Sequence, residues 1–310
     1  MNSSQPRAIL PFVAPFYRPL APFAYALIRA STGAILIPHG VQKLFLGGAA
    51  GLAARILAPW GLPEPLAWAY GVGVLEFAGG VLLVLGLFTR PAALLLAIEL
   101  AVAALGVHAH SGWAWNKGGA QYAVFLALLC AAIFFRGGGR CSLDRIWGMD
   151  SRQSAHDESG DVGAARLFLP ALEGLYRRLA PFSYAFVRVL LCAMLLPSGI
   201  DKVFYGGAAR IAAGNVLKVG VEPPLAWAWA VGGLEFFGAI LLALGLFTRP
   251  IAFALAVEMA AITFRVHYDA GFFWTAHGYE FALLLMLVFL AYAFGGGGRW
   301  SLDRAIGREF

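Results

Sequence analysis

The stretch Leu87-Phe88-Thr89-Arg90-Pro91 separates two long apolar segments, and the same five residues recur at Leu246 to Pro250. A shift of 159 residues aligns Tyr17 to Arg145 with Tyr176 to Arg304 without a gap, and 65 of the 129 aligned positions are identical. Self-similarity at one fixed spacing indicates an internal repeat. The chain is therefore a tandem repeat of one unit, and the two copies can be compared position by position.

The composition predicts a membrane protein. Apolar residues make up 60% of the 310 residues and charged residues 13%, and the mean hydropathy is +0.74. A soluble domain has about 25% charged residues, so this chain has too little polar surface to cover a water-soluble globule.

Each copy contains four apolar stretches close to the roughly 20 residues that a membrane-spanning helix needs. They lie at about Ala24 to Phe45, Leu66 to Phe88, Pro91 to His110 and Gln121 to Phe135, with equivalents 159 residues later. The sequence therefore predicts an all-α integral membrane protein of about eight spans, arranged as two tandem four-helix bundles.

The basic residues predict the orientation. Fourteen arginines fall at the termini, in the linker or in the short loop between the second and third spans, whereas seven basic residues fall on the opposite side. The positive-inside rule then places both termini in the cytoplasm, in a bacterial-type inner (plasma) membrane. Because each copy has an even number of spans, a pseudo-two-fold axis along the membrane normal should relate the copies. The net charge of +6 is thus explained by the orientation of the chain in the membrane. The excess of basic residues also suits binding to anionic lipid headgroups, and we do not expect binding to nucleic acid.

Composition along the chain predicts three segments: a first repeat at 1–147, a flexible polar linker at 148–165 and a second repeat at 166–310. Leu167 to Phe182 mixes apolar with charged residues, which favours a short helix lying in the membrane interface. The N-terminal counterpart is broken by prolines. We do not expect a cleavable signal peptide there, because no uninterrupted apolar core precedes a small-residue cleavage site.

No cofactor motif is found in the sequence. The three cysteines, Cys130, Cys141 and Cys192, occupy unmatched places in the two copies and form no Cys-x-x-Cys pair. Phosphate-binding glycine loops, zinc-type spacings and nucleophile elbows are absent as well. Neither a metal nor a flavin is indicated, so an enzyme built on this chain would need electrons from a partner redox subunit or from a small reductant.

Ionisable residues inside the predicted spans need a physical reason, since one charge at mid-bilayer costs at least about 2.5 to 3.5 kcal/mol. Both copies keep the same three: Arg29 and Arg188, Glu76 and Glu235, Glu99 and Glu258. Similar depths from the cytoplasmic side predict that the arginine of the first span pairs with the glutamate of the third. These arginines and glutamates either have a structural role, in which they fix how the helices pack, or they form a site that binds a proton or a quinone.

A second polar set is predicted at the outer ends of the spans. Each copy has a lysine, a histidine and a tryptophan there: Lys43, His108 and Trp115, and Lys202, His267 and Trp274. Interfacial anchoring explains these residue types, and so does a binding site. Around them the two copies have diverged in sequence. The first copy has His39, Gln42, His108, His110, Gly118 and Gln121, and the aligned positions of the second copy are Ser198, Asp201, His267, Asp269, His277 and Glu280. Both sets contain metal-ligating types, but no local motif fixes them in one shell.

Four motifs carry a resemblance to a known family. They are His-Gly-x-x-Lys-x-Phe from His39, Glu-Phe-x-Gly from Glu76, Gly-Leu-Phe-Thr-Arg-Pro from Gly86 and Gly-Gly-Gly-Arg-x-Ser-Leu-Asp from Gly137. The sequence resembles the DoxX/DoxD family of four-span membrane proteins in both copies, although Ser198 replaces the first histidine in the second. The resemblance implies a four-helix bundle per copy. It also implies a role beside the quinone pool, because family members are described as subunits of thiosulfate:quinone oxidoreductase or of terminal quinol oxidase.

These observations predict a quinone-linked redox subunit with quinone as its cofactor. We expect Glu76, Glu235, Glu99 and Glu258 to move protons, and the quinone to contact Arg29, Arg188, His39, Lys43, Lys202, His108, His267, Trp115 and Trp274. The alternatives are a non-catalytic membrane scaffold or assembly factor, in which the same charges are purely structural, and a small-molecule transporter built from parallel repeats.

Overall fold

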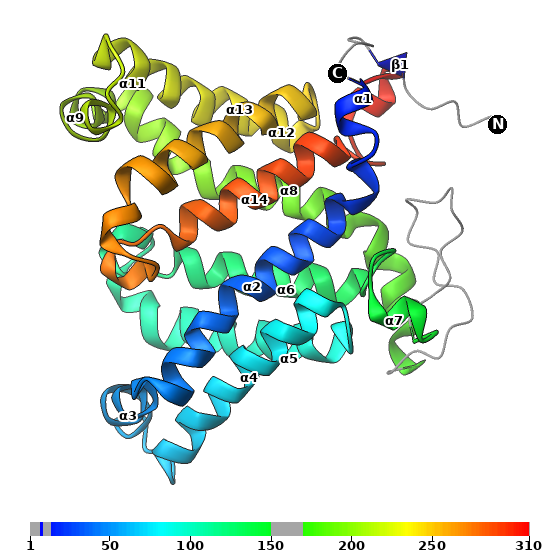
Figure 1. Ribbon diagram of the computed structural model, residues 1–310, viewed down its shortest axis with the longest axis vertical. Coiled ribbons are helices and arrows are strands. Elements are labelled where there is room, and N and C mark those ends of the chain that lie inside the picture. Colours follow the sequence, from blue (N-terminus) through cyan, green and yellow to red (C-terminus); the bar gives the residue numbers. More distant parts are fainter. Residues whose placement is uncertain (1–6, 9–13, 150–169, 310) are drawn as a thin grey trace. The chain divides into compact units, whose positions relative to one another are not determined.

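The computed structural model describes residues 7–8, 14–149 and 170–309 (Figure 1). Contacts divide the chain into two compact units. The first unit is Ile28–Ser183, and the second unit is Tyr184–Phe310 together with Met1–Leu27. Each unit contains one four-helix repeat, and the described part of the chain is helical apart from one short strand pair, which confirms the predicted all-α membrane fold.

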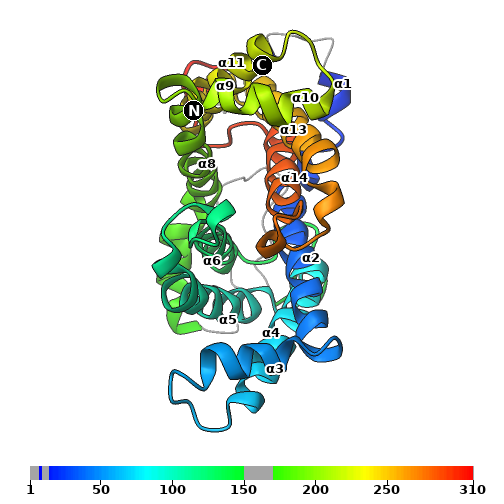
Figure 2. The ribbon, with the colours of Figure 1, turned by 90° about the vertical axis from the view of Figure 1, so that its left-hand side faces the viewer.

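The helices of the first unit follow the predicted pattern closely. They are α2 Ala24–Phe45, α3 Gly48–Leu52, η3 Ala53–Leu57, α4 Pro65–Leu85, α5 Thr89–Val102, η4 Ala103–His108, η5 Ala109–Ser111, η6 Trp115–Lys117, α6 Gln121–Arg136 and α7 Leu143–Ile146. Helix α5 packs between α4 and α6, and the short helix α3 packs on α4 (Figures 1 and 2).

The second unit repeats this order. Its elements are α8 Glu173–Phe204, α9 Gly207–Ile211, η8 Ala212–Val216, α10 Leu217–Val219, α11 Pro224–Gly233, η9 Leu234–Gly238, α12 Ala239–Leu244, α13 Thr248–Ala261, η10 Ile262–Val266, η11 Tyr268–Ala270, η12 Trp274–Ala276, α14 Glu280–Gly295 and α15 Leu302–Ala305. The N-terminal segment adds α1 Ala14–Tyr17, η2 Ala21–Phe23 and strand β1 Arg7–Ala8, which pairs in parallel with β2 Arg308–Glu309. The turn η7 Pro170–Leu172 precedes α8.

Five helices among the described residues are long and apolar enough to cross a membrane: Ala21–Phe45, Pro65–Leu85, Thr89–Ser111, Glu173–Phe204 and Pro224–Leu244. The apolar helices Gln121–Arg136 and Glu280–Gly295 are shorter. These two helices and α13 complete the four-helix sets, so three of the eight predicted spans are not among the five. A separate short interfacial helix at 167–182 was expected, and this prediction is wrong, because α8 is one continuous helix from Glu173 to Phe204. Residues 167–169 of that segment lie outside the described residues.

Helix α4 shows how the spans are built. Its buried positions Ala69, Gly73, Glu76, Gly80 and Leu83 recur at spacings of four and three residues, which places them on one side of the helix. Large apolar side chains cover other positions and are exposed, as a lipid-facing surface requires. The buried side of α4 is therefore made mainly of small residues together with Glu76 and Leu83, and the close approach of small residues is the usual way that membrane helices pack.

The shared sequence motifs form the turn between the second and third helices of each repeat. Gly86 (φ 67°) and Phe88 (φ 46°) adopt left-handed conformations there. The carboxylate of Asp144 accepts hydrogen bonds from the backbone N–H groups of Phe88 (2.7 Å) and Thr89 (2.8 Å), which begin α5. Asp303 does the same in the second unit. The motifs therefore stabilise a turn and a helix N-terminus.

Candidate functional site

A buried ion pair joins the first and second spans of the first unit. Lys43 lies near the end of α2, and Glu76 lies in the middle of α4. The Nζ atom of Lys43 donates to both carboxylate oxygens of Glu76, at 2.8 and 2.6 Å. The two side chains are 13% and 6% exposed, so this charge pair is largely removed from solvent.

Two glycines allow the helices to approach closely enough for this pair. A Cβ atom on Gly40 would lie 2.4 Å from the backbone nitrogen of Phe77, and a Cβ atom on Gly73 would lie 2.9 Å from the Cβ of Lys43. Any larger residue would push α2 away from α4. The sequence thus positions Lys43 through its small neighbours as well as through the charge of Glu76.

A second carboxylate completes the group. Glu99 on α5 lies within electrostatic reach of both Glu76 and Lys43. Its Oε2 atom is buried and has no hydrogen-bond partner among the described residues. We call Lys43, Glu76 and Glu99 the first Lys–Glu–Glu cluster: one cation and two carboxylates from three helices, with one carboxylate oxygen left unsatisfied.

The second unit has the same cluster at Lys202, Glu235 and Glu258. The Nζ of Lys202 binds a carboxylate oxygen of Glu235, and these two side chains are 10% and 3% exposed. Glu258 lies within electrostatic reach of both. Both of its carboxylate oxygens are buried, and among the described residues the carboxyl group of Glu235 lies close enough to share a hydrogen bond with them. The structure thus builds the cluster twice, from equivalent residues.

The surroundings of the two clusters differ. In the second unit Ser198 accepts a further hydrogen bond from Lys202 Nζ at 2.7 Å, and the place of Ser198 is taken in the first unit by His39. The helix that carries Glu235 contains a π turn at Leu234–Gly238, a distortion that is frequent at functional sites, whereas α4 continues as an α-helix through Glu76. The lysine and glutamate of the second ion pair are also less exposed, at 10% and 3% against 13% and 6% in the first.

The predicted pairing of Arg29 with Glu99 is wrong, and so is that of Arg188 with Glu258. The guanidinium of Arg29 donates to the backbone carbonyls of Leu83 (2.5 Å), Val84 (3.3 Å) and Cys141 (2.5 Å). The carbonyls of Leu83 and Val84 belong to the last turn of α4, where carbonyl groups lack the regular bonds of the helix interior and can accept from side chains.

In the second unit Arg188 binds the equivalents of Val84 and Cys141, and it binds Gly297 in place of the equivalent of Leu83. It donates to the carbonyls of Ala243, Gly297 and Trp300. The two arginines thus hold the turn region of each unit together. A role for them in binding quinone remains a prediction that these contacts do not support.

The outer histidines and tryptophans lie in or beside short helical turns: His108 ends η4, and Trp115 begins η6. His108 Nδ1 lies 3.0 Å from the carbonyl oxygen of Gly118, and the backbone N–H of Trp115 donates to Gln121 Oε1 at 3.3 Å. His267 and Trp274 make equivalent contacts with the carbonyl of His277 and with Glu280. Lys43 and Lys202 point instead to the glutamates. These contacts connect each histidine and tryptophan to the segment that follows it in the sequence, and each lysine to a glutamate of the second span.

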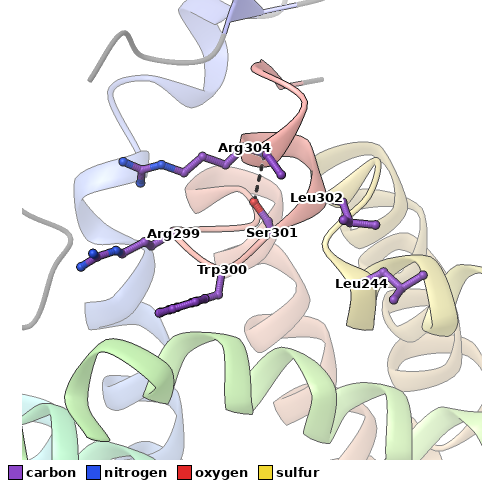
Figure 3. Close-up of a pocket in the computed structure, with 7 residues that line it drawn as sticks. Leu244, Arg299, Trp300, Ser301, Leu302 and Arg304 are labelled. Atoms are coloured by element: carbon purple, nitrogen blue, oxygen red, sulfur yellow. Dashed lines mark hydrogen bonds between the residues drawn. The ribbon is translucent and has the colours of Figure 1, made fainter. Parts of the chain in front are cut away.

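A metal site gains no support from the geometry. In the part of the chain that the structure describes, no group of three or more His, Cys, Asp or Glu side chains is placed to hold a metal ion. A surface pocket lies elsewhere, at the arginine-rich end of the second unit (Figure 3). Leu244, Arg299, Trp300 and Arg304 contribute to its lining, and no residue of the Lys–Glu–Glu clusters does.

Sequence reasoning missed the link between Lys43 and Glu76, although a signal for it exists. Each copy keeps a lysine and a glutamate 33 residues apart, and the intervening loop returns the chain through the membrane. It also missed Ser198 as a partner of Lys202, and Asp144 and Asp303 as the groups that fix the turns. Recurrence in both copies could have drawn attention to Asp144 and Asp303, whereas Ser198 does not recur, because His39 takes its place in the first copy.

Fold and site together define an integral membrane protein made of two four-helix units, each with a charged cluster between its helices. The DoxX family model matches residues 24–109 and 183–268, which together are more than half of the chain. The protein belongs to the DoxX family, as a tandem duplication of the family's unit.

Two relatives of this chain are each about one repeat long. An uncharacterized protein of Haemophilus influenzae is 42% identical over 126 residues, which cover 40% of this chain and 90% of the relative. An uncharacterized membrane protein of Mycobacterium tuberculosis is 28% identical over 152 residues, covering 45% of this chain and 91% of the relative. No solved structure matches the chain.

Proposed function

We propose that this protein is the membrane subunit of a quinone-linked redox system and that its Lys–Glu–Glu clusters exchange protons with the quinone. The observation that carries the proposal is the buried carboxylate oxygen of Glu99 that has no hydrogen-bond partner in the described part of the chain, next to the Lys43–Glu76 ion pair, together with the buried carboxyl group of Glu258 beside Glu235. Unpaired ionisable groups inside a membrane are expensive and are usually functional.

The charges of each cluster favour a role in proton transfer. With Lys43, Glu76 and Glu99 all ionised, the cluster has one cation against two anions. One proton shared by the two carboxyl groups makes the cluster neutral, which the low-dielectric interior favours. A carboxyl that holds its proton only through this balance is a suitable general acid, and its anion is a suitable general base.

Quinone fits this site chemically. Reduction of a quinone to a quinol takes up two electrons and two protons, and its apolar ring and tail keep it inside the bilayer. The chain supplies carboxyl groups for the protons but shows no motif for an electron carrier. The electrons would come from a partner subunit with its own cofactor or from a small reductant, which agrees with the resemblance to thiosulfate:quinone oxidoreductase subunits.

The first unit is the better candidate for the working site. Glu99 is only partly buried, whereas Glu258 is 9% exposed, and Lys43 has no equivalent of the Ser198 hydroxyl that holds Lys202. His39, one helical turn before Lys43, adds a group that can carry a proton. We place the protein in the plasma membrane with both termini in the cytoplasm, because of the distribution of its arginines.

The test begins with purification from membranes in mild detergent and analysis of co-isolated quinone and partner subunits. Glu99→Gln combined with Glu258→Gln should abolish quinone-dependent turnover at equal membrane abundance. Glu173→Gln is the matched control, since Glu173 is a 41% exposed carboxylate paired with Arg177. Full turnover in the double variant, or no bound quinone with any partner present, would refute the proposal.

A scaffold or assembly factor is the second candidate. It is favoured by Arg29 and Arg188, whose guanidinium groups are bound to backbone carbonyls and which both repeats retain for architecture. On this view the Lys–Glu pairs also fix helix positions. The scaffold predicts that purified protein contains partner subunits and no quinone, and that Glu99→Gln changes their amount rather than their turnover.

A further inference from the structure

The N-terminal segment packs on the second repeat rather than on its own. Helix α1 and turn η2 contact α14, and the ring of Tyr17 lies under the guanidinium of Arg249, with 3.9 Å between the ring centroid and Cζ. Arg249 is buried and donates to the backbone carbonyls of Ala293 and Phe294 at the end of α14. We call residues 14–23 the first arm and the Arg249 site the second socket.

The start of α8 makes the reciprocal contact in the first unit. Tyr176 is fully buried, and its ring lies 4.0 Å from the guanidinium of Arg90. Arg90 donates to the carbonyls of Phe134 (3.2 Å) and Phe135 (3.0 Å) at the end of α6, and Phe134 packs edge-on against Tyr176 at 5.4 Å. Residues 173–182 form the second arm, and the Arg90 site is the first socket.

The two contacts are equivalent under the repeat, and they are exchanged. Tyr17 and Tyr176 occupy the same place in the two copies, as do Arg90 and Arg249. However, the tyrosine of the first copy meets the arginine of the second copy, and the tyrosine of the second meets the arginine of the first. Each compact unit is therefore completed by the arm of the other repeat, which explains why the units divide at Leu27 and Ser183.

We infer that the Arg90 and Arg249 sockets are docking sites for the arm of a second copy of the DoxX unit, which this chain supplies by duplication. Exchange of identical elements is a familiar route to dimers. A buried guanidinium over an aromatic face is an attractive contact that a solvent-exposed arm would lose. The linker is then not needed to keep the repeats together, because the arm that precedes α2 belongs to the unit of the second repeat, and the arm that begins α8 belongs to the unit of the first repeat.

A cross-linking experiment on the full chain decides which repeat each arm meets. The three native cysteines are replaced, a protease site is inserted between residues 150 and 165, and Tyr17→Cys is combined with Arg249→Cys or with Arg90→Cys. After treatment with a short bifunctional thiol reagent and cleavage, the Arg249 pair should hold the halves together on a denaturing gel. Release of the halves with the Arg249 pair would overturn the inference.

A second measurement keeps the native arginines. Cleaved full chain with a tag on one half should retain the other half in mild detergent, and Tyr17→Ala with Tyr176→Ala should speed its release about tenfold or more, as the loss of two desolvated cation–π contacts predicts. Phe16→Ala is the matched control, because Phe16 is 76% exposed on the same arm. Equal release from the tyrosine variant and the control, or immediate separation of unaltered halves, would overturn the inference.

Discussion

Removing one member of the Lys202–Glu235 pair should destabilise the protein far more than removing both. Lys202→Met leaves Glu235, which is 3% exposed, beside Glu258 without a cation. Loss of one partner from a buried pair costs about 3 to 5 kcal/mol. At about 2 °C per kcal/mol for a chain of this size, the melting temperature should fall by about 6 to 10 °C.

The double variant Lys202→Met with Glu235→Gln has no uncompensated charge at this pair. We expect it to recover at least half of the lost stability, because the buried charge and not the packing dominates the single variant. The assay is thermal unfolding of purified protein in one detergent, followed by the amount that remains monodisperse.

The exposed pair Arg210–Asp201 is the matched control in the same unit. Its nitrogen–oxygen distance is 3.1 Å and its side chains are 68% and 45% exposed. Arg210→Gln should therefore cost at most about 1 kcal/mol. The reasoning fails if Lys202→Met is no worse than Arg210→Gln, or if the double variant is less stable than Lys202→Met alone.

Three further predictions follow from the structure and the sequence. Arg29→Leu should lower the yield of folded protein by removing three charge-assisted bonds to backbone carbonyls, each of which contributes about 1.5 to 3 kcal/mol; a yield equal to that of the unaltered protein in detergent extracts would contradict this. Lys43→Ala should reduce quinone-dependent turnover more than Lys202→Ala at equal abundance, and equal loss would show that the first unit is not the working half. In a cysteine-free background, Gly51→Cys and Ser154→Cys should be labelled from opposite sides of the membrane, and same-side labelling would refute the orientation.

Hydropathy and the repeat were sufficient to predict the helices, because both depend on local composition. Helices α2 and α6 begin and end within one residue of the predicted spans. The end of α4 was predicted three residues late, since Gly86 and Phe88 take left-handed conformations that close the helix at Leu85. A left-handed phenylalanine has no signature in hydropathy, and Asp144, which stabilises that turn, lies more than fifty residues further along the chain.

Side-chain partners were harder to predict than helices. Counting residues gives the depth of Arg29 and Glu99 along the membrane normal, but it does not say which neighbouring helix each side chain faces. Lys43 was placed at the outer interface from the position of its Cα, whereas the length of the side chain and the close contact at Gly73 bring its amine to Glu76. The exchange of arms was beyond the sequence for another reason: the copies are so similar that either arginine could have met either tyrosine.

The duplication itself separates architecture from candidate chemistry. Identical residues at the arginine-rich end, such as Arg29, Arg90 and Asp144, are bound to backbone groups of turns and helix ends, so their retention in both copies follows from the fold. Glu99 is also retained, as Glu258, yet both carboxyl groups are buried beside a second glutamate, and Glu99 Oε2 has no hydrogen-bond partner among the residues that the structure describes; a well-packed apolar residue would avoid that cost. Stability alone therefore explains the first group and does not explain the second. The glutamates of the third span are for that reason the residues where a test of function is most informative.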